Sequence, residues 1–220
     1  VTNTTFDDFE RTIYLKNKTY IKANLVLSAD GKNSQLRKLL AINTIEKKTG
    51  HIAISGFLKQ SKNHNSTALQ AFTELGPVGI LPFENENIIN FVFSIEKNKY
   101  KQVLSKVNSE QFIADTLSNF FSSINLSFEP INKINNIDNS LSNWPLDLNF
   151  IMNPTSFRTL LIGDAAHSIH PLAGQGLNLS MRDCVAVINS IENSLNFGND
   201  LGDEGILDFY KKNRLPNTIA

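Results

Sequence analysis

The most informative part of this chain is the stretch Leu160-Leu-Ile-Gly-Asp-Ala-Ala-His-Ser-Ile-His-Pro-Leu-Ala-Gly-Gln-Gly-Leu-Asn-Leu179. An apolar run ends at Gly163-Asp164, a loop follows, and a long amphipathic pattern begins near Leu177. That order predicts a buried strand, a loop and the N-terminus of a helix. A carboxylate at the end of a strand can accept hydrogen bonds from the hydroxyls of a sugar or polyol, and the amides of a helix start can donate to an electron-rich group. The stretch therefore predicts one ligand site.

Gly174 and Gly176 stand ahead of the predicted helix. Because glycine has no Cβ, a flat ring can approach the backbone there, and positive φ angles are accessible where the loop turns. The alternative is ordinary turn chemistry, in which a Gly-Asp pair and two glycines only reverse the chain direction. The length of the whole string favours the ligand site.

The segments Gly163-Asp164-Ala165-Ala166-His167 and Gly174-Gln175-Gly176-Leu177-Asn178, with Pro171 between them, resemble the second flavin motif of the FAD-dependent aromatic monooxygenases, the para-hydroxybenzoate hydroxylase superfamily. The continuation through Leu179 to Arg182-Asp183 is most similar to the ubiquinone-biosynthesis hydroxylases of that superfamily. The resemblance implies that Asp164 binds the ribityl chain of FAD. The residues it assigns to the cofactor in this motif are Asp164, Pro171, Gly174, Gln175, Gly176, Leu177 and Asn178.

In the same resemblance, backbone around Gly176 meets the pyrimidine edge of the flavin, and Pro171 lines the reaction cavity. His170 is a second candidate to face that cavity. The sequence assigns no side chain a catalytic role beyond these two cavity candidates.

A second motif runs from Ala23 to Arg37, where an apolar strand enters the turn Asp30-Gly31. From the residues alone it is a turn that closes a strand, with Ser34 capping a short helix. Beside the first motif it resembles the Asp-Gly fingerprint of the same superfamily. That likeness implies that Asp30 and Gly31 lie near the FAD pyrophosphate and that Arg37 serves the nicotinamide co-substrate, NAD(P)H. The sequence departs from the family at Ser28, where glycine is usual.

Weaker likenesses join the two motifs. The segment Ala71–Phe83 resembles part of the sheet that these hydroxylases place over the substrate, and Trp144-Pro145-Leu146 matches a short element before the Gly-Asp strand. The predicted fold class is α/β with an α+β insertion: a partial Rossmann-like FAD/NAD(P)-binding domain and a mixed-sheet substrate domain. The predicted boundaries are 1–48 for a partial FAD-binding domain, 49–152 for the substrate-binding sheet domain, and 153–220 for the FAD-binding domain with the C-terminal helices.

No Gly-x-Gly-x-x-Gly string occurs, although the superfamily uses one to bind the ADP half of FAD. The chain starts at Val1, close to a predicted hairpin with strands at 12–15 and 20–23. We therefore expect a fragment that lacks the first nucleotide-binding unit.

Composition limits the classes of partner. Lys plus Arg and Asp plus Glu both number 21, so no net charge attracts nucleic acid or an anionic membrane. No run of about 18 apolar residues predicts a membrane-spanning helix. The single cysteine, Cys184, excludes an internal disulfide and is expected to be a buried thiol on an apolar helix stripe.

His167 and His170 form a His-x-x-His pattern, but zinc takes about four ligands and no Cys or His cluster lies nearby in the sequence. We predict no metal site and expect His167 to bond within its own loop. Helices are expected at 97–107 and 109–121. Four aromatic residues are candidates either for core packing or for an apolar tunnel: Phe72, Phe83, Phe91 and Phe93.

The leading interpretation is an FAD-dependent monooxygenase that uses NAD(P)H and O2 to hydroxylate a polyprenyl phenol of ubiquinone biosynthesis. It implies a lipid-soluble aromatic substrate, a ubiquinone-biosynthesis complex as partner, and a cytoplasmic enzyme at the surface of the inner membrane, on the matrix side in a mitochondrion. Two alternatives stay open. One is a non-hydroxylating flavoprotein such as a reductase or a halogenase, although Trp144 is the only tryptophan and halogenases carry a Trp-x-Trp-x-Ile-Pro element. The other is an inactive truncated fragment.

Overall fold

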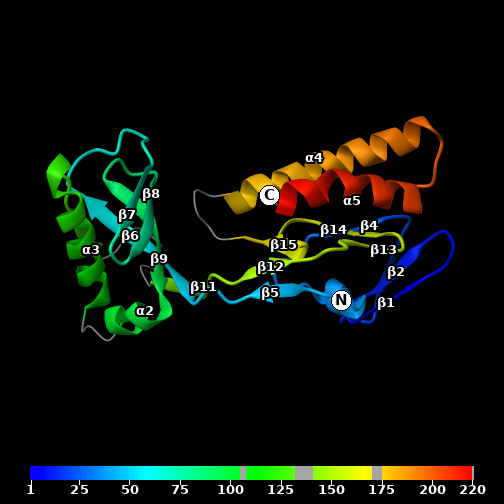
Figure 1. The fold of residues 1–220 in the computed structure, drawn as a ribbon, viewed down its shortest axis with the longest axis horizontal. Helices are drawn as coiled ribbons and strands as arrows, with labels where there is room; N and C mark the ends of the chain where they lie inside the picture. Colours follow the sequence, from blue (N-terminus) through cyan, green and yellow to red (C-terminus); the bar gives the residue numbers. More distant parts are fainter. Residues whose placement is uncertain (105–107, 132–140, 170–174, 220) are drawn as a thin grey trace. The chain divides into compact units, whose positions relative to one another are not determined.

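The computed structural model describes residues 1–104, 108–131, 141–169 and 175–219. The chain forms two compact units (Figure 1). Unit 1 comprises residues 1–47 and 147–220, and unit 2 comprises residues 48–146. Unit 2 is thus inserted into the sequence of unit 1. Both units combine strands with helices, as the predicted fold class requires.

The strands of unit 1 form three small sheets. The first is an antiparallel meander of β1 (Asn3–Phe6), β2 (Arg11–Tyr14) and β3 (Tyr20–Ala23), which confirms the predicted hairpin. The second has the order β13-β14-β4, formed by Thr155–Ser156, Thr159–Leu161 and Val26–Ser28. The third has the order β15-β12-β5, formed by His167–Ser168, Leu148–Phe150 and Ile45–Lys47.

Strands β4 and β14 are parallel and adjacent, with Leu161 paired to Ser28. Every residue of β14 is buried, as predicted for the apolar run before Gly163. Helices α4 (Gln175–Asn196) and α5 (Glu204–Ile219) run alongside this sheet in Figure 1. Leu160 of β14 packs in one apolar cluster with residues of both helices: Val187, Leu207 and Tyr210. Because β4 and β14 are parallel, their carboxyl ends lie at the same edge of the sheet. The packing of α4 on β14 places that helix close to this edge.

Helix α4 buries an unexpectedly polar face. Its buried residues are Leu179, Asp183, Val187, Ser190 and Ser194. Its opposite face exposes apolar side chains: Leu177, Met181, Val185, Ile188 and Leu195. The predicted buried thiol is wrong, because Cys184 is exposed. Apolar periodicity gave the wrong orientation because hydrogen bonds to Asp183 decide which side of α4 faces the rest of unit 1.

Arg158 joins segments of unit 1 that lie far apart in the sequence. Its buried guanidinium donates to the carbonyls of Asp8 and Asn24 and forms a bidentate ion pair with Asp200, in the turn between α4 and α5. The hydrogen bond from Arg158 holds the pKa of Asp200 at about 2. Arg158 thereby connects the N-terminal meander, the entry to β4 and the helical hairpin.

Unit 2 is a mixed domain built on a large antiparallel sheet of order β10-β6-β9-β8-β7, with β11 also paired to β6. Its strands are β6 (His51–Gln60), β7 (Leu69–Thr73), β8 (Gly76–Pro82), β9 (Ile88–Glu96), β10 (Phe128–Pro130) and β11 (Ser142–Pro145). Its helices are α2 (Lys97–Leu104), α3 (Ser109–Phe120) and the short η1 (Ser122–Ile124). Helix α1 (Gln35–Leu39) and the short η2 (Gly163–Ala165) belong to unit 1.

The two faces of the unit 2 sheet differ in burial. Alternate residues of the strands pack in one core with Ile113 and Leu117 of α3. Phe91 and Phe93 belong to that core and are fully buried, so of the two roles left open for them the structure supports packing. Phe72 is 71% exposed and Phe83 is half-buried. These two stay available to a ligand.

Phe93→Ala should destabilise the protein by about 3–5 kcal/mol, because it removes a fully buried ring and leaves a cavity. The matched change Phe72→Ala, in the same sheet, should alter the unfolding free energy by less than about 0.5 kcal/mol. Urea unfolding of both variants measures the difference. Equal losses would mean that the two faces of the sheet are misassigned.

Candidate functional site

The candidate site begins where β14 ends. The Ile162 amide donates to the Ser28 carbonyl over 3.0 Å, which continues the parallel pairing one residue past the strand. The chain then turns into η2 at Gly163, whose φ of 58° is in the left-handed region that favours glycine. A Cβ at Gly163 would also lie 3.2 Å from Ser180 Oγ of α4. Glycine at this position lets the turn pack closely against α4.

Asp164, the next residue, is exposed. Its neighbours Ala165 and Ala166 are buried, and the Ala166 amide donates to the Gly163 carbonyl over 2.8 Å to close the turn. No hydrogen bond joins the Asp164 carboxylate to another described residue. The turn therefore presents one carboxylate to solvent at the carboxyl edge of the sheet.

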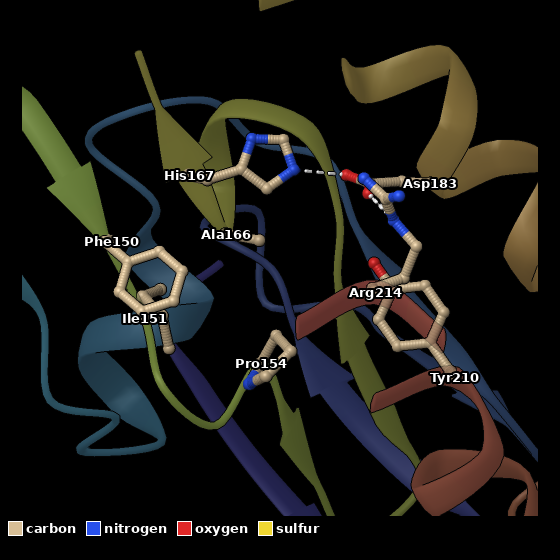
Figure 2. Close-up of a pocket in the computed structure, with 8 residues that line it drawn as sticks. All are labelled: Phe150, Ile151, Pro154, Ala166, His167, Asp183, Tyr210 and Arg214. Atoms are coloured by element: carbon tan, nitrogen blue, oxygen red, sulfur yellow. Dashed lines mark hydrogen bonds and ion pairs between the residues drawn. The ribbon is translucent and has the colours of Figure 1, made fainter. Parts of the chain in front are cut away.

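Asp183 of α4 holds this turn from one side. Its Oδ2 accepts from the Gly163 amide over 2.8 Å and from His167 Nε2 over 2.6 Å. Its Oδ1 accepts from Arg214 Nε of α5 over 2.6 Å. Figure 2 shows the His167 and Arg214 side chains pointing toward this carboxylate. The prediction that His167 bonds within its own loop is wrong, because its partner lies on α4.

The Asp183 side chain is 0% exposed. Burial raises the pKa of its carboxyl, but His167, the Gly163 amide and Arg214 outweigh burial and hold that pKa below its ordinary value. Asp183 is therefore charged at neutral pH in spite of being buried. Removing one member of a buried ion pair costs stability, because the remaining member keeps a buried charge without its partner.

A small cavity of about 10 Å³, room for about one water molecule, lies beside this network. Its lining residues are Phe150, Ile151, Pro154, Ala166, His167, Asp183, Tyr210 and Arg214 (Figure 2). The Tyr210 hydroxyl donates to the Leu161 carbonyl over 3.3 Å, and burial raises its pKa. The cavity is too small to hold a substrate or a flavin.

The Asp-Gly motif lies after β4, at the same edge of the sheet. Asp30 is exposed, but its carboxylate accepts from Ser28 Oγ and from the first amides of α1. Burial raises the pKa of Asp30, and these hydrogen bonds more than compensate and lower it. Gly31 has a φ of 83°. Ser34 Oγ accepts from the Arg37 amide over 3.0 Å, which confirms the predicted cap.

Arg37 is buried in unit 1. Its guanidinium donates to the Ala165 carbonyl over 2.8 Å and to the Lys32 carbonyl over 2.6 Å. The turn that carries Asp164 is thus held from a second side by the Asp-Gly motif. Sequence reasoning placed the two motifs at one ligand but did not predict this direct contact between them.

The start of α4 supplies the remaining described candidates. Gln175, Leu177 and Asn178 are exposed, and a Cβ at Gly176 would meet nothing within 4 Å. Ser180, which packs on Gly163, donates to the Gly176 carbonyl over 3.0 Å and so connects the helix start to the Asp164 turn. The other predicted residues of this loop, His170, Pro171 and Gly174, lie outside the described residues.

No group of three or more His, Cys, Asp or Glu side chains in the described part of the chain is placed to hold a metal ion. None of the described helices has both the length and the apolar character needed to cross a bilayer.

Comparison with known proteins identifies the family. The model of the FAD binding domain family matches residues 8–219. The chain therefore belongs to the FAD binding domain family, and the resemblance inferred from the two motifs is confirmed. FAD is the cofactor of this family.

Curated relatives extend the likeness along almost the whole chain. It is 30% identical to the mitochondrial ubiquinone biosynthesis monooxygenase COQ6 of Caenorhabditis elegans, over 95% of this chain and 53% of the relative. It is 29% identical to the 3-demethoxyubiquinol 3-hydroxylase of Escherichia coli, over 97% of this chain and 51% of the relative. The chain thus spans about half the length of these relatives.

Solved structures agree on the fold. The flavin-dependent halogenase CmlS matches with a TM-score of 0.75 at 16% identity, over 100% of this chain and 40% of that chain. Klebsiella pneumoniae HpxO, solved with FAD and uric acid, matches with a TM-score of 0.69 at 18% identity, over 99% of this chain and 54% of that chain. At these identities the likeness is one of fold alone.

The described residues fit FAD. A ribityl chain is a polyol, and the exposed Asp164 carboxylate is an acceptor suited to its hydroxyls. The space in front of Gly176 leaves the first turn of α4 open to a flat ring, with helix-start amides as donors. Ser180 contacts both the Gly163 turn that carries Asp164 and the Gly176 carbonyl at the helix start. The two features are therefore close enough for one ligand to reach both.

Asp183→Asn should lower the unfolding free energy at neutral pH by about 3–5 kcal/mol, because it removes the negative partner of buried Arg214. The pKa of Asp183 is depressed in the folded protein, so its stabilisation is complete above the unfolded value of about 3.9 and is lost as pH falls through the lower folded value. The gap between wild type and variant should therefore narrow as pH falls below about 3.9. Urea unfolding across that range tests this, and a gap independent of pH would contradict it.

Proposed function

We propose that this chain forms part of an FAD-dependent monooxygenase that uses NAD(P)H and O2 to hydroxylate a polyprenyl phenol of ubiquinone biosynthesis. The observation that carries the proposal is the likeness to ubiquinone-pathway hydroxylases along 94–97% of the chain, joined to an exposed Asp164 whose turn is fixed by hydrogen bonds on both sides. Each supports a different part of it. The relatives support the reaction and the geometry supports the cofactor.

The contribution of unit 1 is to bind and orient. Asp164 accepts hydrogen bonds from the ribityl hydroxyls, and the amides at the start of α4, with Gly176 and Leu177, receive the pyrimidine edge. Asp30 and Gly31 complete the same edge of the sheet, near the pyrophosphate. When bound, FAD supplies the oxygen chemistry of the reaction. The chain itself supplies position, and the reaction needs no side chain as a covalent nucleophile.

The contribution of unit 2 is an apolar surface for the substrate. The face of its sheet that α3 does not cover carries Phe72, Leu81 and Val92, which strand alternation places on one side. Phe57 and Phe83 pack edge to face beside them, with ring centroids 5.0 Å apart. Each buried methylene of a prenyl tail contributes about 0.8 kcal/mol, so such a face favours a lipid-tailed ring over a small soluble phenol.

A lipid-soluble substrate also supports the proposed location. A polyprenyl phenol resides in a membrane, so the enzyme must meet the membrane surface to reach it. We propose peripheral contact with the inner membrane, on the matrix side in a mitochondrion, and membership of a ubiquinone-biosynthesis complex. Mitochondrial COQ6 relatives are consistent with this location.

Asp164→Ala in the full-length protein should weaken FAD binding about 30-fold, because a hydrogen bond to a charged group contributes about 2 kcal/mol. Asp208→Ala removes another exposed carboxylate of unit 1, on α5, and should leave FAD affinity unchanged. Titration of the apoprotein with FAD, followed by flavin fluorescence, measures both. Wild-type affinity in the Asp164 variant would reject this residue as a cofactor ligand.

The full-length gene should restore quinone synthesis in a bacterium that lacks the corresponding hydroxylase, and the Asp164→Ala gene should not. Quinone extraction and chromatography measure the product. If the gene fails while the purified enzyme hydroxylates a small soluble phenol, the substrate is wrong and only the monooxygenase reaction survives.

A further inference from the structure

We propose that Asp183 is a positioning residue of the cofactor site: its carboxylate clamps both ends of the turn that presents Asp164 to FAD. The inference rests on the proposed function, since it assigns Asp183 a role toward the cofactor that Asp164 binds. Nothing in the sequence pattern assigns it such a role. Asp183 is a buried acid in the middle of a long helix, and no step of the reaction uses it.

The two carboxylate oxygens of Asp183 have different partners. Oδ1 faces Arg214 of α5, at 2.6 Å, and this contact alone would join the two helices. Oδ2 accepts from the Gly163 amide and from His167 Nε2, at 2.8 and 2.6 Å. One oxygen therefore serves the helical hairpin, while the other serves only the turn.

The two partners of Oδ2 stand on either side of Asp164 in the sequence. Gly163 precedes it directly and His167 follows it by three residues, so a single oxygen fixes the entry and the exit of the turn. Asp164 is the exposed residue between them. On the other side, Arg37 fixes the Ala165 carbonyl at 2.8 Å. The segment around Asp164 is therefore held at three residues, Gly163, Ala165 and His167.

A purely structural role would not require this arrangement. Replacing a buried ion pair by apolar residues of similar volume is often neutral or stabilising, so helix packing alone gives no reason to keep a charge here. An acceptor with two oxygens is needed only because a backbone N–H, an imidazole and a guanidinium converge on it. A ligand that must be held to within a fraction of an ångström explains such a support.

The first experiment compares two Asp–Arg pairs of unit 1. Asp183→Asn places an amide N–H toward either Arg214 or Gly163, so one contact becomes donor against donor, and FAD should bind at least tenfold more weakly with an altered visible circular dichroism of the bound flavin. Asp200→Asn breaks the ion pair with Arg158 at the other end of the helical hairpin. It should lower the melting temperature while FAD affinity stays within twofold of wild type. Equal loss of affinity in both variants, or none in Asp183→Asn, would overturn the proposal.

The second experiment remains decisive if Asp183→Asn fails to fold. His167→Gln keeps an N–H donor near Asp183, whereas His167→Leu keeps only bulk. The glutamine variant should bind FAD within about twofold of wild type, and the leucine variant at least fivefold more weakly. Matching affinities in the two variants would overturn the role of the Oδ2 contact.

A double variant separates this proposal from the proposed function. Because Asp183 and His167 act through Asp164, His167→Leu should have no further effect on FAD affinity once Asp164 is alanine. If Asp164→Ala weakens FAD binding and His167→Leu adds its full effect on top, the positioning role is wrong and the cofactor site stands. If Asp164→Ala leaves binding intact, both fail together.

Discussion

A carboxylate shielded from water is tolerated in a protein only where donors replace the hydration that it loses. Asp183 meets this condition with a backbone amide, an imidazole and a guanidinium, and each comes from a different element of unit 1. The turn after β14, the strand β15 and the helix α5 are thereby fixed relative to α4. Removing the charge takes the Asp183 carboxylate from Arg214, Gly163 and His167 at once, so the three contacts depend on one another. The orientation of α4 and the position of the Asp164 turn both depend on this interaction.

The candidate site could be proposed from the sequence because its parts follow one another along the chain. Strand, Gly-Asp turn and helix start follow one another within twenty residues, and the Ser34 cap of α1 has an equally local signature. Sequence reasoning did not find Asp183 as a site residue, although Arg182-Asp183 was part of the family likeness. Its three donors come from separate parts of the chain, and such convergence exists only after folding. The one available signal was an acid in register with Val187, Ser190 and Ser194 on one side of the helix.

The same limit explains the two faces that were assigned incorrectly or left open. Apolar spacing on α4 predicted burial of Cys184, yet specific hydrogen bonding outweighs a modest apolar stripe and turns that stripe outward. In unit 2, the sequence left Phe72, Phe83, Phe91 and Phe93 open between core packing and a tunnel, because it could not say which of them share the face under α3. Phe72 and Phe93 lie on opposite faces of the sheet, and only the face with Phe93 packs against α3. The resemblance to known flavoproteins fixed the family, whereas the faces needed the tertiary structure.

The contacts of Arg158 have a consequence for the order of folding during synthesis. Unit 2 is continuous in sequence, so all of its strands have been made by Leu146. Unit 1 is split around it, and the guanidinium of Arg158 joins Asp8 and Asn24 to Asp200. A chain that emerges from the ribosome at about 5–20 residues per second folds its domains as they become complete. The inserted sheet can therefore close first, whereas the Asp8 and Asn24 carbonyls gain their donor only when Arg158 has been made, and that guanidinium gains its counter-ion only when Asp200 follows.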